Sequence, residues 1–318
     1  MRIVVVDGHT MNPGDNPWDE IAALGELVIY ERSTHEQLIE RAGKADVIIT
    51  NKVPITAEDL KGLVNLKLIA VTATGYNVVD TEAARAHGIA VTNVPVYGTQ
   101  NVAQFTFALL LELCHHVGRH DASVKQGNWT RSEDFCYWET PQVELAGRTL
   151  GLVGYGRIGR KVARIARAVD MRVIAVDPRN QPGRSEGEIR FVDMRTAFSE
   201  ADVVSLHCPQ TAETTGLVNT DRLSLMRADA FLINTARGGL MVERDLADAL
   251  NNDKIAGAAI DVVAVEPIRA DNPLLRAKNI IITPHMAWAS LAARKRLMTV
   301  TAENIRAFQR GKPVNVVN

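Results

Sequence analysis

Short apolar segments alternate with helix-like stretches along this chain, and this alternation limits the possible folds more than any other feature of the sequence. In the first part of the chain, stretches such as THEQLIERAG (34–43) separate apolar segments at roughly 20-residue intervals, at 3–6, 27–30, 47–50, 68–72 and 89–93. Short buried strands that alternate with helices are typical of a parallel sheet with helical crossovers. We therefore expect a small parallel α/β unit here.

A second, longer series follows a long apolar stretch (99–118), for which we expect one helix, and a polar insertion with aromatic residues (125–141). Its strands are expected at 149–153, 172–176, 203–207, 231–234, 256–260 and 279–283. Six strands with helical crossovers predict a complete doubly wound sheet. The last segment (290–318) has the pattern of one amphipathic helix and a tail without a strand. We hypothesise that it packs back on the first unit and makes that domain discontinuous.

The overall composition excludes several classes of partner. The chain has 318 residues, more than a single hydrophobic core usually supports, so two domains are expected. Its formal net charge is −1, with 46% hydrophobic and 23% charged residues. This balance offers neither the basic surface that binds nucleic acid nor a cationic belt for a membrane, so we expect small-molecule partners.

The cysteines and the N-terminus point to the cytoplasm. Cys114, Cys136 and Cys208 are odd in number and form no C-x-x-C pair, which argues against a disulfide framework and a zinc cage. The apolar run near the N-terminus is too short for a secretory signal, and no run approaches the length of a membrane helix. We expect a cytoplasmic protein with no membrane partner.

A glycine-rich turn opens the second series. GLVGYGRIG spaces Gly154, Gly156 and Gly159 as G-x-G-x-x-G, directly after a predicted strand and before a predicted helix. In that position the first glycine makes the tight turn, the second lets backbone approach a pyrophosphate, and the third lets the helix pack on the strand. The N–H groups at the helix start then face the phosphates. The alternative is a purely structural glycine turn, since glycine-rich turns are common and the spacing alone is a weak signal.

An acidic residue at the end of the next strand indicates which dinucleotide binds. Asp177 lies 18 residues after Gly159, where a carboxylate can hydrogen-bond a ribose 2′-hydroxyl and repel the 2′-phosphate of NADP. NAD is therefore the expected cofactor. Arg179 lies close by, and since an arginine there can accommodate the phosphate, use of NADP is not excluded.

Three polar residues are expected at one edge of the larger sheet. Arg237, Glu266 and His285 each follow one of the last three predicted strands, and ligands of open α/β sheets bind outside the carboxyl ends of the strands. Taken singly, an arginine near a Gly-Gly turn, a glutamate in a loop and a histidine after a proline have ordinary structural explanations. Their joint placement favours a site.

The three side chains suit the reduction of a 2-keto acid. A guanidinium binds a carboxylate through a planar fork. An imidazole titrates close enough to neutrality to give a proton to a carbonyl oxygen and take it back. A carboxylate bonded to the other ring nitrogen selects the tautomer and favours the charged ring. Each residue therefore has a separate role.

The remaining histidines do not indicate a metal site. His116 and His120 have the i, i+4 spacing of two ligands on one helix face, with His115 beside them. No third ligand or flanking glutamate accompanies the pair, and imidazoles near a helix C-terminus interact favourably with its dipole. We expect these histidines to be structural and predict no metal.

The motifs together resemble a known family. NTARGG (234–239), DVVAVEP (261–267), TPHMAWAS (283–290), GYGRIG (154–159) and ATGYNVVD (73–80) resemble the D-isomer-specific 2-hydroxyacid dehydrogenases, and the likeness runs through essentially the whole chain. ATGYNVVD, DFCYWETP (134–141) and Trp288 are most similar to the glycerate dehydrogenase or hydroxypyruvate reductase branch. Phosphoglycerate-type members carry Gly at the position of Trp288, which argues against a bulky phosphorylated substrate.

The resemblance implies roles for individual residues. Arg237 would bind substrate, Glu266 and His285 would form the acid–base pair, and backbone N–H groups of Gly75 and Tyr76 would hold the substrate carboxylate. Thr74, Trp138 and Trp288 would shape the pocket, Trp138 reaching into a neighbouring subunit. Further cofactor contacts would come from Arg157, Ile158, Asp177, His207, Cys208, Pro209, Thr214, Thr235, Ala236 and Asp261, the last near the nicotinamide amide.

These expectations combine into one prediction of fold and function. The fold class is α/β with two doubly wound parallel-sheet domains: a flavodoxin-like substrate-binding domain (1–98 plus 289–318) and a larger Rossmann domain (99–288) that binds NAD. The resemblance implies a homodimer joined through an arm near 119–146. The expected reaction is NADH-dependent reduction of hydroxypyruvate or glyoxylate to the D-hydroxy acid. Alternatives are the same chemistry on a lactate-type or branched 2-keto acid, and a cofactor-sensing, corepressor-like binding protein.

Overall fold

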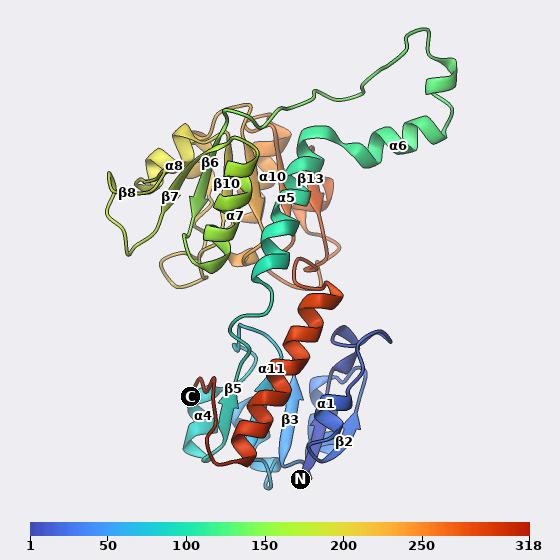
Figure 1. The fold of residues 1–318 in the computed structure, drawn as a ribbon, viewed down its shortest axis with the longest axis vertical. Coiled ribbons are helices and arrows are strands. Elements are labelled where there is room, and N and C mark those ends of the chain that lie inside the picture. Colours follow the sequence, from blue (N-terminus) through green and yellow to red (C-terminus); the bar gives the residue numbers. More distant parts are fainter. The chain divides into compact units, whose positions relative to one another are not determined.

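The structure is a computed structural model that describes all residues, 1–318. The chain forms two compact units (Figure 1). Unit 1 comprises Met1–Gly98 and Ala289–Asn318, and unit 2 comprises Thr99–Trp288. Unit 1 is therefore discontinuous in sequence, and its last helix returns to it from the far end of the chain.

Unit 1 contains a five-stranded parallel sheet in the order β2-β1-β3-β4-β5. This is the strand order of flavodoxin-like sheets. The strands contain residues expected from the apolar pattern, because both faces of the sheet are covered and strands of such a sheet are apolar throughout. Their bounds are β1 (Arg2–Val5), β2 (Glu26–Ile29), β3 (Val47–Thr50), β4 (Leu68–Val71) and β5 (Ala90–Thr92).

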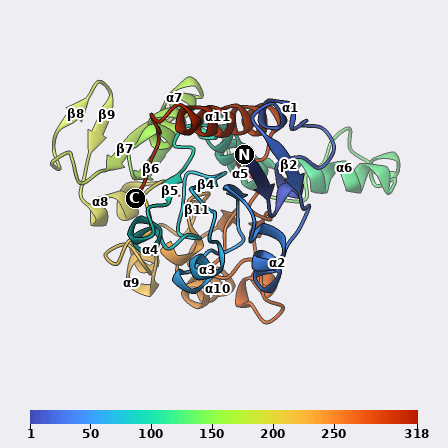
Figure 2. The same ribbon diagram turned by 90° about the horizontal axis from the view of Figure 1, so that it is seen from below.

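Helices cover both faces of this sheet. Figure 2 shows α1 and α11 on one face and α2, α3 and α4 on the other. Their bounds are α1 (Asp19–Ala22), α2 (Leu38–Ala42), α3 (Ala57–Gly62), α4 (Thr81–Ala86) and α11 (Leu291–Gln309), with 3₁₀ turns η1 (Gly8–Thr10) and η2 (His35–Gln37).

Two polar side chains attach the C-terminal helix α11 to the N-terminal part of unit 1. Arg294 is 7% exposed and forms a two-pronged ion pair with Asp15, at 2.5 and 2.7 Å. Asn304 is buried and donates from Nδ2 to the carbonyl of Asn93 at 2.9 Å. The tail, expected to lack a strand, forms an isolated antiparallel bridge from Val316 to Thr92, and the Val317 N–H donates to the Val91 carbonyl at 2.9 Å.

Unit 2 contains an eight-stranded sheet in the order β13-β12-β11-β10-β6-β7-β9-β8. The chain starts in the middle at β6, runs outward through β7 and β9, and then returns to build β10 to β13 on the other side, as in a Rossmann fold. The bounds are β6 (Thr149–Val153), β7 (Arg172–Val176), β8 (Ser185–Glu186), β9 (Ile189–Phe191), β10 (Val203–Leu206), β11 (Phe231–Asn234), β12 (Gly257–Ile260) and β13 (Ile280–Ile282). The predicted fold class is confirmed for both sheets.

Successive residues of these strands enter opposite cores. Phe231 and Ile233 face the core under α5 and α7, while Leu232 between them faces the core under α9 and α10. Figure 2 shows α7 on one side of this sheet and α9 and α10 on the other. The bounds are α5 (Thr99–His115), α6 (Val117–Lys125), α7 (Arg157–Ala168), α8 (Met194–Glu200), α9 (Thr220–Leu225) and α10 (Glu243–Asn251), with 3₁₀ turns η3 (Trp129–Arg131), η4 (Gly238–Leu240) and η5 (Pro273–Arg276).

Two sequence-based predictions for unit 2 were wrong. The expected single helix over 99–118 ends at His115, because His116 adopts a left-handed conformation (φ 45°) and α6 begins after it. The short hairpin β8–β9 was not predicted, since β8 has two polar, exposed residues and no apolar pattern.

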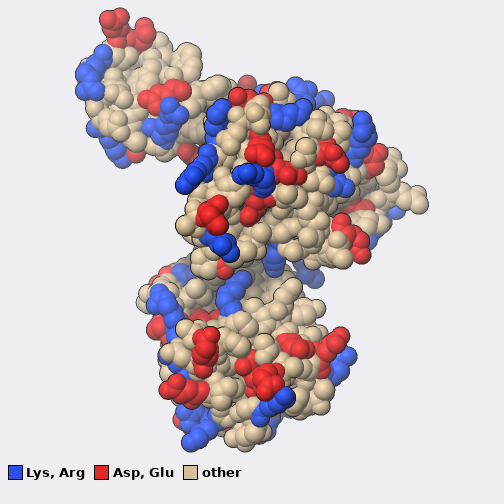
Figure 3. Space-filling view, turned by 180° about the vertical axis from the view of Figure 1, so that it is seen from behind, with Lys and Arg blue, Asp and Glu red and all other residues tan.

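No helix of the structure combines the length and the apolarity that a membrane span requires. On the face shown in Figure 3, positive and negative side chains are interspersed over each unit.

Candidate active site

The glycine turn after β6 has the shape of a phosphate cradle. A Cβ on Gly154 (φ 104°) would lie 2.6 Å from the backbone of His207 and Cys208, and one on Gly159 would lie 2.3 Å from the carbonyl oxygen of Gly154. A Cβ on Gly156 would meet nothing within 4 Å. Packing therefore demands the outer two glycines, whereas the middle one borders open space at the start of α7. These residues fit a dinucleotide pyrophosphate.

Arg157 and Ile158 begin α7 directly after this turn. Ile158 is half-buried, and its side chain packs against the core. Arg157 is exposed. Their backbone N–H groups lie in the first turn of the helix, where such groups have no intrahelical partner.

The loop after β10 lies against the glycine turn through the Gly154 contact. His207 hydrogen-bonds Ser205 Oγ through Nε2 at 2.9 Å, and burial lowers the pKa of His207 to about 4. This histidine is therefore neutral at physiological pH. Burial also raises the pKa of Cys208, which keeps it a thiol. Thr214 folds the loop back by donating to the Pro209 carbonyl at 2.8 Å.

Asp177 directly follows β7 and is 5% exposed. Its carboxylate accepts two bonds from the Arg179 guanidinium, at 2.9 and 2.7 Å, one from the Arg179 N–H at 2.9 Å and one from the Tyr155 N–H at 3.2 Å. The arginine bonds lower the pKa of Asp177 to about 2, so it is charged at any working pH. Asp177, which favours NAD in the sequence analysis, and Arg179, which leaves NADP possible there, thus form an ion pair.

The turn after β11 presents Arg237. Asn234, fully buried, accepts from the Ala236 N–H at 2.9 Å and donates to the Arg237 carbonyl at 2.8 Å. Thr235 Oγ1 lies 3.0 Å from Thr106 Oγ1 of α5. The backbone is thereby held while the Arg237 guanidinium is exposed.

Gly238 joins the Arg237 turn to the loop that carries Glu266. A Cβ on Gly238 would lie 1.9 Å from the carbonyl carbon of Val263 and 2.4 Å from the nitrogen of Ala264. Only glycine allows this contact of backbone with backbone. The turn after β11 and the loop after β12 therefore pack directly against each other, backbone to backbone.

Glu266 and His285 contact each other directly. His285 Nδ1 lies 2.6 Å from Glu266 Oε2, and each side chain is about one third exposed (29% and 32%). The other oxygen of Glu266 accepts from the Val263 N–H at 3.3 Å. With Nδ1 committed to Glu266, the Nε2 atom of His285 is the ring nitrogen left for a substrate.

Asp261 holds the loop of His285. It is 1% exposed, and it accepts from Thr283 Oγ1 at 2.6 Å and from the N–H groups of Met286 and Ala287 at 2.9 and 2.8 Å. Burial raises the pKa of Asp261, although these hydrogen bonds oppose the shift. This scaffold explains how His285 is held with a positive φ of 52°. The sequence interpretation gave Asp261 only a cofactor contact.

The predicted carboxylate-binding loop lies in unit 1, after β4. Thr74 donates from Oγ1 to the Val94 carbonyl at 2.9 Å and accepts at its own carbonyl from Asn93 Nδ2 at 2.8 Å. Gly75 and Tyr76 follow, and Tyr76 is 38% exposed. The loop is thus anchored at Thr74, with Gly75 half-buried and Tyr76 exposed.

Asp7 at the end of β1 was missed by the sequence analysis. Its carboxylate accepts from three consecutive N–H groups after β3, those of Asn51, Lys52 and Val53, at 2.5 to 3.1 Å. Burial raises the pKa of Asp7, against these bonds. The Asp-Gly pair at the end of the first strand was its only sequence signal.

Two predicted pocket residues occupy different surroundings. Trp138 lies in the segment beyond η3, outside any helix or strand, and is 67% exposed. Trp288 is half-buried at the last position of unit 2.

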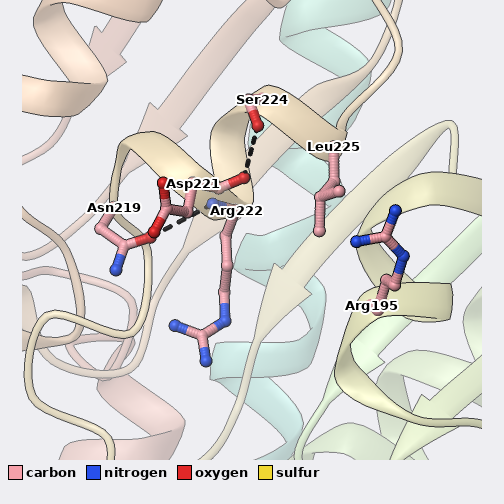
Figure 4. Close-up of a pocket in the computed structure, with 6 residues that line it drawn as sticks. All are labelled: Arg195, Asn219, Asp221, Arg222, Ser224 and Leu225. Carbon is pink, nitrogen blue, oxygen red and sulfur yellow. Dashed lines mark hydrogen bonds between the residues drawn. The ribbon is translucent and has the colours of Figure 1, made fainter.

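A separate pocket of about 510 Å³ lies between α8 and α9 (Figure 4). Arg195 faces Leu225 across it, while Arg222 donates elsewhere, to the Leu217 carbonyl at 2.7 Å. None of the predicted site residues lines this pocket; its walls are Arg195, Asn219, Asp221, Arg222, Ser224 and Leu225.

Comparisons with known proteins agree with this geometry. Residues 107–287 match the family model for the NAD-binding domain of D-isomer-specific 2-hydroxyacid dehydrogenases. The chain is 47% identical to hydroxypyruvate reductase from Blautia hydrogenotrophica over the whole of both chains, and 42% identical to glycerate dehydrogenase from Methylorubrum extorquens, covering 91% and 90% of the two.

Among solved structures, an acyclic imino acid reductase in complex with NADPH and D-Arg superimposes with a TM-score of 0.86 at 32% identity over the full length of both chains. The chain belongs to the D-isomer-specific 2-hydroxyacid dehydrogenase family, and it is an oxidoreductase that acts on small 2-hydroxy or 2-keto acids with NAD(P).

Proposed function

We propose that this protein reduces hydroxypyruvate, and glyoxylate with it, to D-glycerate and glycolate, with NADH as the preferred reductant. The 2.6 Å contact between His285 and Glu266 carries the proposal, because it leaves one ring nitrogen available for proton transfer. The names of the relatives, hydroxypyruvate reductase at 47% identity and glycerate dehydrogenase at 42%, support this choice of substrate.

In the proposed mechanism each of three side chains has one task. Arg237 binds the substrate carboxylate and orients the keto group. Protonated His285 donates from Nε2 to the keto oxygen, and in the reverse direction the neutral ring takes that proton back. Glu266 holds the Nδ1 proton and stabilises the charged ring. A bound nicotinamide cofactor supplies the hydride that reduces the keto carbon.

Cofactor binding is proposed for the glycine turn, Asp177 and the loops after β10 and β11. The open space at Gly156 supports a pyrophosphate there. We further propose that Gly75 and Tyr76 of unit 1 donate backbone N–H groups to the substrate carboxylate, and that Thr74 and Trp288 shape the pocket. The anchoring of that loop at Thr74 supports this assignment.

We also propose that the protein is a homodimer joined through the arm (119–146), with Trp138 reaching the neighbouring subunit. Trp129, Phe135 and Trp138 are 52%, 88% and 67% exposed, an unusual amount of aromatic surface for a monomer. Light scattering on the purified chain is expected to give about twice 34.8 kDa, whereas a concentration-independent monomer would remove this proposal.

The proposed substrate and cofactor are tested by initial rates of NADH and NADPH oxidation. The substrates are hydroxypyruvate, glyoxylate, pyruvate and a branched 2-keto acid. The highest kcat/KM is expected for hydroxypyruvate with NADH. Activity confined to another acid would keep the Arg237–Glu266–His285 chemistry and reject the substrate. No activity on any of them would favour a binding protein.

The ion pair of Asp177 with Arg179 leads to a prediction on cofactor choice. Replacement of Asp177 by Ser removes the charged acceptor for the ribose hydroxyl and the negative charge that repels a 2′-phosphate. Hydrogen bonds to charged groups contribute about 1.5–3 kcal/mol, so the ratio of kcat/KM for NADH over NADPH is expected to fall by about 10-fold or more. Arg179→Ala is expected to raise the same ratio, since it uncovers the charge of Asp177. Equal ratios in wild type and Asp177→Ser would contradict the assignment.

A further inference from the structure

The loop that carries Glu266 has no helix or strand between β12 and η5. Glu243, the first residue of α10, reaches into this loop with both carboxylate oxygens. Oε1 accepts from the Ala264 N–H at 2.8 Å, and Oε2 accepts from Asn272 Nδ2 at 2.9 Å. The two contacts lie on either side of Glu266 in the sequence.

We propose that Glu243 is a positioning residue for the acid–base pair: it fixes the loop so that Glu266 meets Nδ1 of His285. This inference rests on the proposed roles of Glu266 and His285. Glu243 acts only through the loop, and none of its contacts involves Arg237, Glu266 or His285.

The support beneath Glu243 is rigid. Leu246, Ala247 and Leu250 of α10 are 0–2% exposed, so the helix is anchored in the core of unit 2. α10 also packs against η5, which begins directly after Asn272. A carboxylate at the start of a helix is favoured by the helix dipole. The loop is thus attached to a fixed element.

Asn272 can present only one face to Glu243. Its Oδ1 accepts from the Leu274 N–H at 3.0 Å and caps η5, so its Nδ2 group is the one turned to Glu243 Oε2. The pattern of donors and acceptors is therefore fixed: a backbone N–H and an amide N–H₂ both point at Glu243. A side chain at position 243 needs two acceptors to satisfy both.

The rate of the proposed reaction depends on the precise position of Glu266. The contact with His285 is 2.6 Å long, and the Val263 N–H donates to the other oxygen of Glu266. Val263 is next to Ala264, whose N–H donates to Glu243. A misplacement of about 1 Å in a catalytic constellation can cost about 100-fold in rate. Loss of one of the two hydrogen bonds that Glu243 accepts is therefore expected to reduce turnover, although the residues that bind substrate and cofactor are unchanged.

The first test is Glu243→Gln, which keeps the size of the side chain and replaces one acceptor by a donor. Either the Ala264 N–H or Asn272 Nδ2 then faces an N–H₂ group. We expect kcat for hydroxypyruvate reduction to fall about 10-fold or more, by the same loss of placement, while the dissociation constant for NADH, measured by fluorescence, stays at the wild-type value. Arg244→Gln, on the exposed next residue, is the control and is expected to behave as wild type.

The second test restores the pattern with the groups exchanged. In Glu243→Gln combined with Asn272→Asp, the introduced glutamine accepts from Ala264 and donates to the introduced aspartate, whose other oxygen still accepts from Leu274. Asn272→Asp alone places two carboxylates face to face and is expected to lower kcat. The combination is expected to recover most of the wild-type kcat, which a general loss of stability would not produce.

A third test compares Glu266→Gln with and without Glu243→Gln, and it distinguishes failure of the role of Glu243 from failure of the proposed acid–base pair. Glu266→Gln is expected to lower kcat by itself, and Glu243→Gln is expected to add less than a twofold loss in that background, because coupled residues are not additive. Wild-type kcat in Glu243→Gln, no recovery in the exchanged pair, or full additivity would each overturn the role of Glu243 alone. An unchanged kcat in Glu266→Gln would instead reject the proposed acid–base pair, and the inference with it.

Discussion

Replacement of His285 by Gln is expected to lower kcat for 2-keto acid reduction by about 10²–10⁴-fold, the range typical of a lost general acid. The amide preserves a hydrogen-bonding side chain, but its N–H protons are far too weakly acidic to be transferred at neutral pH. Affinity for NADH is expected to remain close to wild type, since the proposed cofactor contacts lie in the glycine turn and at Asp177. Steady-state rates with hydroxypyruvate and fluorescence titration with NADH measure the two effects separately.

His87→Gln is the matched control for that experiment. His87 is the C-cap residue that directly follows α4 in unit 1; it is exposed, and its ring hydrogen-bonds locally, to the carbonyl of Ala83 at 2.9 Å. We expect its kcat to equal that of wild type. If His285→Gln retained full turnover, proton donation by His285 would be rejected, whatever the fold and the family of the chain.

Gly238→Ala is expected to have the second largest effect. The added Cβ would lie 1.9 Å from the carbonyl carbon of Val263 and 2.0 Å from its oxygen. Both are backbone atoms, so no change of rotamer relieves the clash. Either the Arg237 turn or the Glu266 loop must move, which is expected to lower kcat/KM by about 100-fold and the free energy of unfolding by about 1–3 kcal/mol.

Urea unfolding and steady-state kinetics on the same preparation check both parts of this prediction. Gly118→Ala in α6 serves as the control, because its new Cβ would have only Glu112 Oε1 nearby, at 3.7 Å. That variant is expected to keep its activity and to be slightly stabilised, since Ala is a better helix former than Gly. Wild-type stability and kinetics in Gly238→Ala would mean that the two loops are not locked together as described.

Much of the fold was predictable because its information is local. Each buried strand of a parallel sheet is an apolar run, so eleven strands, five in unit 1 and six in unit 2, were visible in the sequence. The hairpin β8–β9 was not, since two exposed polar residues carry no such pattern. The break of the long helix at His116 was missed for the same reason: a single left-handed residue leaves the apolar periodicity intact.

Some residues of the candidate site could likewise be identified from the sequence, and others could not. Arg237, Glu266 and His285 were identified from their positions after consecutive strands, and the structure places all three at the carboxyl ends of neighbouring strands. Their catalytic roles remain predictions. The contacts that hold them were missed. Asn234 acts locally, on the Ala236 N–H and the Arg237 carbonyl. Glu243 and the contact of Gly238 with Val263 join segments that are far apart in the sequence.

By itself, the sequence determined the α/β class, the two strand series, the glycine cradle and the residue types available for chemistry, because strand burial and turn conformation depend on neighbouring residues. Tertiary structure alone decided that Asp261 holds the His285 loop and that Glu243 holds the Glu266 loop. Hydrogen-bond partners and steric exclusion depend on which loops the sheet brings together, and distance along the chain does not report that.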